Sequence, residues 1–235
     1  MKNYALYGFI SAIVVTLFSL LFYFTGLQTE HLDIGANAQW LLAISSFTII
    51  YLGVKEEREG RPEQRMSYGG AVGGALAISL VAAVLNAAYA YIHFSYVNTN
   101  FGEYMIQYQT AKMTAAGMPD NVVEKATERM QNSFGPVRQA ITSGIITVIS
   151  GFIYGLMLAP GQTQRGTIKR IALVNGIICG VIGLLAGAAS GFLSKTVGSS
   201  ALIGMLGGGI GAWLVTFLLL KYTNYTPRFA NEEAD

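Results

Sequence analysis

Few side chains in this sequence have the types and spacing of a catalytic or transport site. None of its 13 Asp and Glu residues lies in the middle of a long apolar stretch, and no Lys or Arg does either. An ionisable group inside a membrane span is costly and usually functional, and proton- or sodium-coupled transporters normally need one. The polar candidates that remain are Asn86 and Asn175, of which Asn86 lies well inside its apolar stretch. Asn86 either makes an interhelical hydrogen bond worth about 0.6–2 kcal/mol or lines a path for a small solute.

His93 and the segment Glu30-His31-x-Asp33 are the other places where a proton or a cation could bind. His93 lies near the end of its apolar stretch, where an imidazole either packs or senses pH. The segment offers three short-range ligands in a loop, with no second His nearby, which makes a weak cation site. The single cysteine, Cys179, excludes an intrachain disulfide, a Cys-based zinc site and an iron–sulfur cluster. We therefore expect no metal and no cofactor.

Nucleotide-binding and hydrolase motifs occur only as fragments. Gly207-x-Gly209-x-x-Ala212 has the dinucleotide-binding spacing, but it lies in an apolar stretch with no preceding strand. Gly191–Thr196 resembles the end of a P-loop, except that Ser194 stands where a Gly is required. The sequence contains neither Gly-x-Ser-x-Gly nor His-Glu-x-x-His. We expect a protein that is not an enzyme and that has no identifiable small-molecule substrate.

The elements that must position these residues are membrane helices. Of 235 residues, 52% are hydrophobic and only 12% are charged, with a mean hydropathy of +0.45, whereas soluble domains carry about 25% charged residues. A bilayer core about 30 Å thick needs about 20 apolar residues in a helix. Six stretches qualify, at roughly 4–26, 36–54, 68–96, 137–159, 168–193 and 199–222. Because spanning backbone must hydrogen-bond within itself, the sequence predicts an all-α polytopic transmembrane helix bundle with six spans. The net charge of +2 is too small to indicate a nucleic-acid partner.

The distribution of Lys and Arg sets the orientation of this bundle. Six spans place both termini and the second and fourth loops on one side, and Lys195 is the one basic residue in the short loops of the other side. The basic residues of the first side are Lys2, Lys55, Arg58, Arg61, Arg65, Arg165, Lys169, Arg170, Lys221 and Arg228. We therefore predict cytoplasmic N- and C-termini in a bacterial cytoplasmic (inner) membrane.

Residues 97–136 form the only substantial segment outside the predicted spans. Two helices are expected in it, Phe101–Ala116 and Asp120–Asn132, with Gly117 as a helix stop and Pro119 at the restart. The segment is predicted to be an extracytoplasmic helical hairpin between spans 3 and 4. It can dock on its own bundle, lie at the lipid interface or contact a partner.

Small residues recur at helical spacing in several predicted spans, where close packing and hydrogen bonds must hold helices together because lipid provides no hydrophobic drive. On the third span the stripe is Ala75, Ser79, Ala82, Asn86, Ala90 and His93. The fifth and sixth spans carry stripes of the glycine-zipper type, which are Gly176, Gly180, Gly183, Gly187 and Gly191, and then Gly204, Gly208 and Gly211. The stripes predict helix packing, with a pore lining or a surface that grips another subunit as the alternatives.

Residues 1 to about 160 resemble bacterial membrane proteins of the domain of unknown function 4199 (DUF4199) family. The features shared in order are an N-terminal span that opens Tyr-x-x-Tyr-Gly, a second span that ends Gly-Val-Lys-Glu-Glu-Arg-Glu at 53–59, and Met-Ser-Tyr-Gly-Gly-Ala at 66–71. A Tyr-rich exit, an acidic external segment and the Gly-Pro pair before the fourth span follow. The resemblance implies a four-span unit, residues 1–160 including the external segment 97–136, and transfers no activity. Residues 161–235, a Gly-rich two-span hairpin with a short cytoplasmic tail, lie outside it.

These observations predict a non-enzymatic structural or accessory membrane protein. Its partners would be the lipid bilayer, copies of itself, or subunits of a larger membrane complex, bound through the small-residue faces. The alternative is a small-solute channel or transporter lined by the polar stripe around Asn86. A continuous polar cavity would favour the alternative, and a dry, close-packed bundle would favour the first.

If the glycine stripe of the fifth span packs helices, the substitutions Gly183→Leu and Gly187→Leu will disrupt folding or assembly, because a large side chain separates the backbones. Expression level, detergent stability and oligomer size measure the effect. Wild-type values of all three would contradict a packing role.

Overall fold

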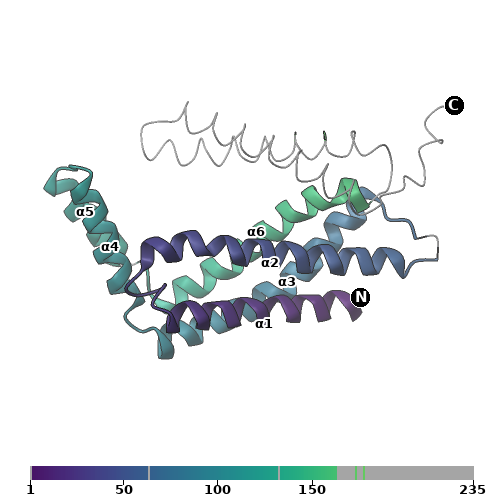
Figure 1. Cartoon of the computed structure of the whole chain (residues 1–235), viewed down its shortest axis with the longest axis horizontal. Coiled ribbons are helices and arrows are strands. Elements are labelled where there is room, and N and C mark those ends of the chain that lie inside the picture. Colours follow the sequence, from purple (N-terminus) through teal and green to yellow (C-terminus); the bar gives the residue numbers. More distant parts are fainter. Residues whose placement is uncertain (1, 63, 132, 163–172, 174–176, 178–235) are drawn as a thin grey trace. The chain divides into compact units, whose positions relative to one another are not determined.

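The computed structural model describes residues 2–62, 64–131 and 133–162, together with Leu173 and Ile177, and all its elements in these residues are helices (Figure 1). Their order is α1 (Lys2–Phe24), α2 (Leu32–Glu59), α3 (Tyr68–Ile92), the π-helix η1 (His93–Val97), α4 (Phe101–Ala115), α5 (Asp120–Gln131) and α6 (Pro136–Gln162). The all-α prediction is confirmed for this part of the chain. The predicted spans at 168–193 and 199–222 lie outside the described residues.

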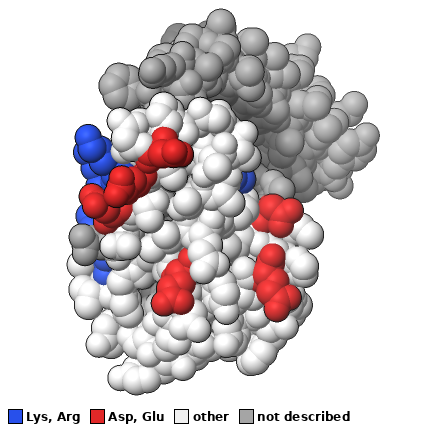
Figure 2. Space-filling view, turned by 90° about the vertical axis from the view of Figure 1, so that its left-hand side faces the viewer, with Lys and Arg blue, Asp and Glu red and all other residues white. Residues whose placement is uncertain are grey.

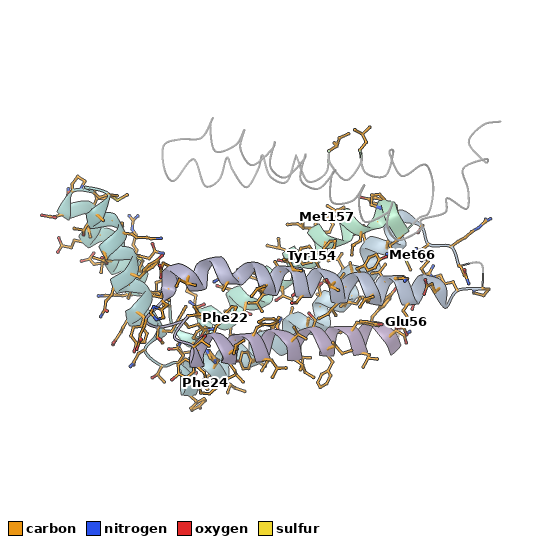
Figure 3. All side chains as sticks on the ribbon, viewed as in Figure 1. Phe22, Phe24, Glu56, Met66, Tyr154 and Met157 are labelled. Atoms are coloured by element: carbon orange, nitrogen blue, oxygen red, sulfur yellow. The ribbon has the colours of Figure 1, made fainter. Side chains whose placement is uncertain are left out.

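Three of the described helical segments are long and apolar enough to cross a membrane, namely Asn3–Phe24, Tyr68–Val97 and Pro136–Gln162. They correspond to the first, third and fourth predicted spans. Large apolar side chains remain exposed along them. On α1, Phe24 is 78% exposed while Phe22 is only 5% exposed (Figure 3). Exposed apolar surface of this extent is unusual for a protein in water, and the helices are those of a membrane protein. The second predicted span, 36–54, lies within α2, and the total of six spans stays a prediction.

The chain forms two compact units. Unit 1 comprises Met1–Gly53 and Ala75–Phe152, and unit 2 comprises Val54–Gly74 and Ile153–Asp235. In unit 2, Val54 and Ala159 are fully buried, and the Tyr68 hydroxyl donates a hydrogen bond to the Leu156 carbonyl at 3.3 Å. A side-chain to backbone bond therefore joins the start of α3 to the last part of α6.

Glycines of α1 and α2 bring these helices very close to α3 in unit 1. A Cβ added to Gly8 of α1 would lie 2.7 Å from the carbonyl oxygen of Ile78, and one added to Gly53 of α2 would lie 2.7 Å from the Ile78 Cδ1. Real Cβ atoms essentially never show such separations. Glycine is therefore required at Gly8, where the close atom belongs to the backbone, whereas a Cβ at Gly53 would displace the Ile78 and Tyr7 side chains.

Glycines of α6 form the third contact with α3. A Cβ on Gly151 would overlap the Ser79 side chain, and one on Gly144 would lie 3.5 Å from the Ala87 Cβ. Close approach through small residues is the packing that lipid requires. Helix α3 is thus the central helix of unit 1, contacted by α1, α2 and α6.

The helices α4 and α5 begin where the sequence predicts, and α4 ends one residue earlier than predicted. Helix α4 stops because Gly117 adopts a left-handed φ of +71°, which a residue with a Cβ rarely adopts. The Gly117 and Met118 amides donate to the carbonyls of Thr114 and Met113 at 2.9 and 3.1 Å, which is the Schellman pattern. A hydrogen bond of 3.1 Å between the hydroxyls of Thr110 and Thr127 then joins the two helices.

The surface of α4 and α5 is polar. Neither helix contains a buried residue, and acidic side chains lie on the face that they present, with Lys and Arg side chains at one edge (Figure 2). Charged side chains on the lipid side of a helix would be costly. Neither helix is among the described segments that are long and apolar enough to cross a membrane.

Substitution Gly8→Leu should destabilise the protein by about 1–3 kcal/mol, because the larger side chain forces α1 away from the α3 backbone. The matched control is Gly73→Leu on α3, where a Cβ meets nothing within 4 Å. Thermal unfolding of the purified variants in detergent measures both effects. Equal midpoints for the two variants would contradict the importance of this contact.

Candidate functional site: the buried polar face of α3

One face of α3 and η1 is buried along its length. It consists of Ala75, Ser79, Ala82, Asn86, Ala90 and His93, whose exposed fractions lie between 0 and 6%. The spacing of three and four residues returns each of them to the same side of a helix. We call this set the α3 face. It brings together Ala75, Ser79 and Asn86, which the sequence singles out for packing or partner binding.

Asn86 joins α3 to α6 in the middle of this face. Its Nδ2 donates to the Thr147 Oγ1 at 3.3 Å, and Thr147 in turn donates to the Ser143 carbonyl at 2.8 Å. The Asn86 Oδ1 and the Ser79 Oγ are buried and find no hydrogen-bond partner among the described residues. Unsatisfied buried polar atoms cost about 1–3 kcal/mol each, so both atoms are candidate sites for a buried water or a polar ligand.

His93 is the centre of a second polar cluster, at the end of the α3 face. It is fully buried. Its Nε2 lies 2.9 Å from the Gln28 Oε1, and its Nδ1 lies 3.0 Å from the Tyr89 hydroxyl. Asn98 donates to the same Gln28 oxygen at 3.3 Å. The cluster therefore ties the loop between α1 and α2 to the end of η1.

The hydrogen bonds of Gln28 determine which nitrogen of His93 carries the proton. The Gln28 Nε2 donates to the Ser19 carbonyl oxygen at 3.2 Å, and because a carbonyl only accepts, this bond fixes the orientation of the amide. The Gln28 Oε1 must then accept, so the His93 Nε2 bears a hydrogen. In the neutral ring, the Nδ1 accepts from the Tyr89 hydroxyl. Every group in this cluster thus has a defined donor or acceptor role.

The local backbone around His93 is a π-helix. The Asn98 amide donates to the His93 carbonyl at 2.8 Å, five residues back instead of four. π-Turns inside α-helices are rare and are frequently found at functional sites. The aromatic rings of Tyr23 and Phe94 stand edge-on to the imidazole, with centroid distances of 5.8 and 5.0 Å. The imidazole is therefore enclosed by aromatic rings as well as by hydrogen bonds.

Several residues singled out in the sequence do not contribute to this site. His31 of the Glu30-His31-x-Asp33 segment is exposed, and no group of three or more His, Cys, Asp and Glu side chains in the described residues could hold a metal ion. The glycines of the fifth and sixth predicted spans lie outside the described residues. They are Gly176, Gly180, Gly183, Gly187, Gly191, Gly204, Gly208 and Gly211.

The sequence analysis missed Gln28, Tyr89 and Asn98. Gln28 and His93 lie 65 residues apart in the sequence, and no local sequence pattern predicts such a contact. Tyr89 is four residues before His93, so its position one helical turn away was a usable signal.

Comparisons with known proteins give one match. The family described as Protein of unknown function (DUF4199) matches residues 6–160. Neither the curated proteins nor the solved structures contain a match to the chain.

Substitution Gln28→Leu should destabilise the protein by about 1–3 kcal/mol, because it leaves the His93 Nε2–H and the Asn98 amide without an acceptor. The control is Gln107→Leu on α4, where the Gln side chain is exposed. Combining Gln28→Leu with His93→Phe should cost less than the sum of the single changes. Thermal unfolding in detergent provides the values, and strict additivity would contradict the coupling.

Proposed function

The chain belongs to the DUF4199 family of proteins of unknown function, and we propose that it is a non-enzymatic structural or accessory protein of the membrane. In this proposal the described helices are part of a bundle of six spans, with α2 as the second span. The protein assembles with itself or with a larger membrane complex through its small-residue faces.

The observation that carries the proposal is the burial of the α3 face, together with the glycines of three other helices that lie against α3. A solute path along α3 would need space next to Ser79 and Asn86. Instead, Gly151 lies against Ser79, and Gly8 lies against the α3 backbone near Ile78. Packing of this kind supports a rigid, dry scaffold.

We place the protein in a bacterial inner membrane with both termini in the cytoplasm. The excess of Lys and Arg on the side of the termini supports this orientation. It puts α4 and α5 outside the cytoplasm, and their exposed charged side chains are compatible with an aqueous compartment. There they are available to a partner.

A small-solute channel or transporter is the second candidate. It is favoured by one observation, that the buried Ser79 Oγ and Asn86 Oδ1 have no hydrogen-bond partner in the described residues. Waters that enter between α3 and α6 would satisfy both atoms and would begin a polar path.

Cysteine accessibility separates the two candidates. In a Cys179→Ser background, Ser79→Cys and Asn86→Cys should react with a small water-soluble thiol reagent at least tenfold more slowly than Thr114→Cys, which lies at an exposed position of α4. A scaffold excludes water from the α3 face, whereas a channel admits it. Fast labelling at both α3 positions, together with solute flux in liposomes, would overturn the scaffold proposal.

Topology and assembly are measured with the same protein. Thr114→Cys should react in intact cells with a reagent that cannot cross the membrane, and Arg61→Cys should react only after permeabilisation. Light scattering of gently solubilised protein should give a protein mass well above the 25.2 kDa of one chain. A strictly monomeric protein in native lipid would count against the accessory role.

A further inference from the structure

Arg58 is a buried cation on α2 and is not part of the α3 face. The predicted spans place it in the second loop, but α2 continues to Glu59, so Arg58 is helical. Its exposed fraction is only 9%. A buried arginine stays charged, and its charge must be compensated by an anion or by hydrogen bonds.

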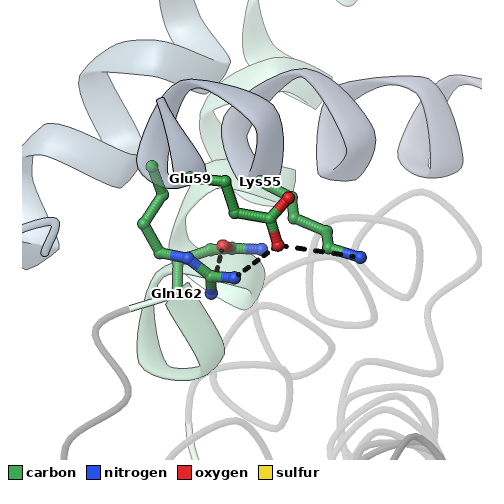
Figure 4. Close-up of polar contacts among 4 residues, drawn as sticks. Lys55, Glu59 and Gln162 are labelled. Atoms are coloured by element: carbon green, nitrogen blue, oxygen red, sulfur yellow. Dashed lines mark hydrogen bonds and ion pairs between the residues drawn. The ribbon is translucent and has the colours of Figure 1, made fainter. Parts of the chain in front are cut away.

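The described contacts of Arg58 compensate its charge poorly. Its Nη1 donates to the Gln162 Oε1 at 3.0 Å, and this amide is neutral. Its Nη2 lies 3.3 Å from the Glu59 Oε1 (Figure 4). This distance is longer than the 2.7–2.9 Å typical of charge-assisted bonds. The same Glu59 oxygen lies 3.9 Å from the Lys55 Nζ, and the Glu59 side chain is 50% exposed.

One edge of the guanidinium lacks a full set of hydrogen-bond partners. Within the described residues, the Arg58 Nε is buried and has no hydrogen-bond partner. The Nε and the Nη2 form the side edge of the group, which binds carboxylates and phosphates through two parallel hydrogen bonds. Among the described residues, only the loosely held Glu59 carboxylate contacts this edge. A stronger anion can therefore replace it when the exposed Glu59 side chain turns toward solvent.

The position of Arg58 along α2 selects the anion. The apolar stretch of α2 ends at Val54, which is fully buried, and Arg58 follows about 6 Å further along the helix axis. The headgroup region of a bilayer extends about 5–8 Å beyond the hydrocarbon core on each side. Arg58 is thus at the depth of the lipid phosphates.

We propose that Arg58 binds the phosphate group of a phospholipid headgroup through its Nε–Nη2 edge, with Gln162 holding the opposite side of the guanidinium. The inference rests on the proposed membrane span in α2. Arg61 is the contrasting residue of the same segment, because its side chain is 42% exposed and is paired with Glu57 at 3.7 Å. Binding is therefore specific to Arg58 and is not a property of the whole basic segment.

Native mass spectrometry of the full-length, delipidated protein tests the proposal with phosphatidylglycerol, phosphatidylethanolamine and diacylglycerol of identical acyl chains. Wild type should retain one phospholipid of either headgroup and no diacylglycerol. Arg58→Gln should weaken phospholipid binding at least tenfold, while Arg61→Gln should bind as wild type does. Inorganic phosphate, added as a competitor, should not displace the lipid at millimolar concentration. Complete displacement would assign the site to free phosphate instead.

Glu59→Gln is the variant whose expected effect, tighter phospholipid binding, cannot result from misfolding. Removing the competing carboxylate should tighten phospholipid binding severalfold, whereas a purely structural Arg58 leaves it unchanged. Wild-type lipid affinity in both Arg58→Gln and Glu59→Gln would overturn the inference. The cysteine accessibility of the α3 face is independent of this result, so the scaffold proposal can stand when the lipid site fails.

Discussion

The structure depends on how closely α3 can approach its neighbours. Between helices in lipid there is no gain from removing apolar surface from water, so dispersion contacts and a few hydrogen bonds must hold them together. These contacts grow steeply as backbones approach. Gly8, Gly53 and Gly151 permit such approach on three sides of α3. Each of these helices therefore depends on α3, and the loss of one contact would weaken the whole of unit 1.

Close approach has a chemical consequence for the polar side chains on α3. Water is excluded where backbones meet, so Asn86 and His93 must find partners within the protein. Thr147 accepts one hydrogen bond from the Asn86 amide, and the Asn86 Oδ1 has no partner among the described residues, whereas Gln28 and Tyr89 satisfy both ring nitrogens of His93. At the centre of the α3 face some buried polar atoms thus lack hydrogen-bond partners, whereas at its end the His93 ring has all of its partners. A water or a polar ligand would therefore bind at the centre, near Asn86. The end, near His93, connects the first loop to η1.

Local sequence rules account for much of the fold. The small and polar residues of the α3 face follow the helical period, so their common side could be predicted from spacing. The end of α4 and the start of α5 could be predicted because Gly117 and Pro119 restrict their own backbone conformation. The extension of α2 to Glu59 was missed, although Lys, Glu and Arg are good helix formers. The end of an apolar stretch is a boundary of hydrophobicity. A helix ends where its hydrogen bonding ends, so the two boundaries need not coincide.

Other features could not be predicted because their causes are not local. The contact between Gln28 and His93 joins residues far apart in the chain, and it forms only after α1 and α3 have packed. The hydrogen bond between Arg58 and Gln162 likewise joins residues that lie 104 apart in the chain. A single sequence carries no signal for either pair. The site residues that spacing predicts are those on one helix, and those contributed by loops and helix ends require the tertiary structure.

The wide turn at His93–Val97 bears on how sequences of this kind can diverge. Its hydrogen bond closes between residues five apart, so this turn holds one residue more than an α-helical turn. Loss or gain of a residue here rotates the following chain by about 100° and leaves the preceding part of α3 in register. An insertion or deletion at this turn would therefore redirect the chain that leads into α4, and it would also move Asn98 relative to Gln28.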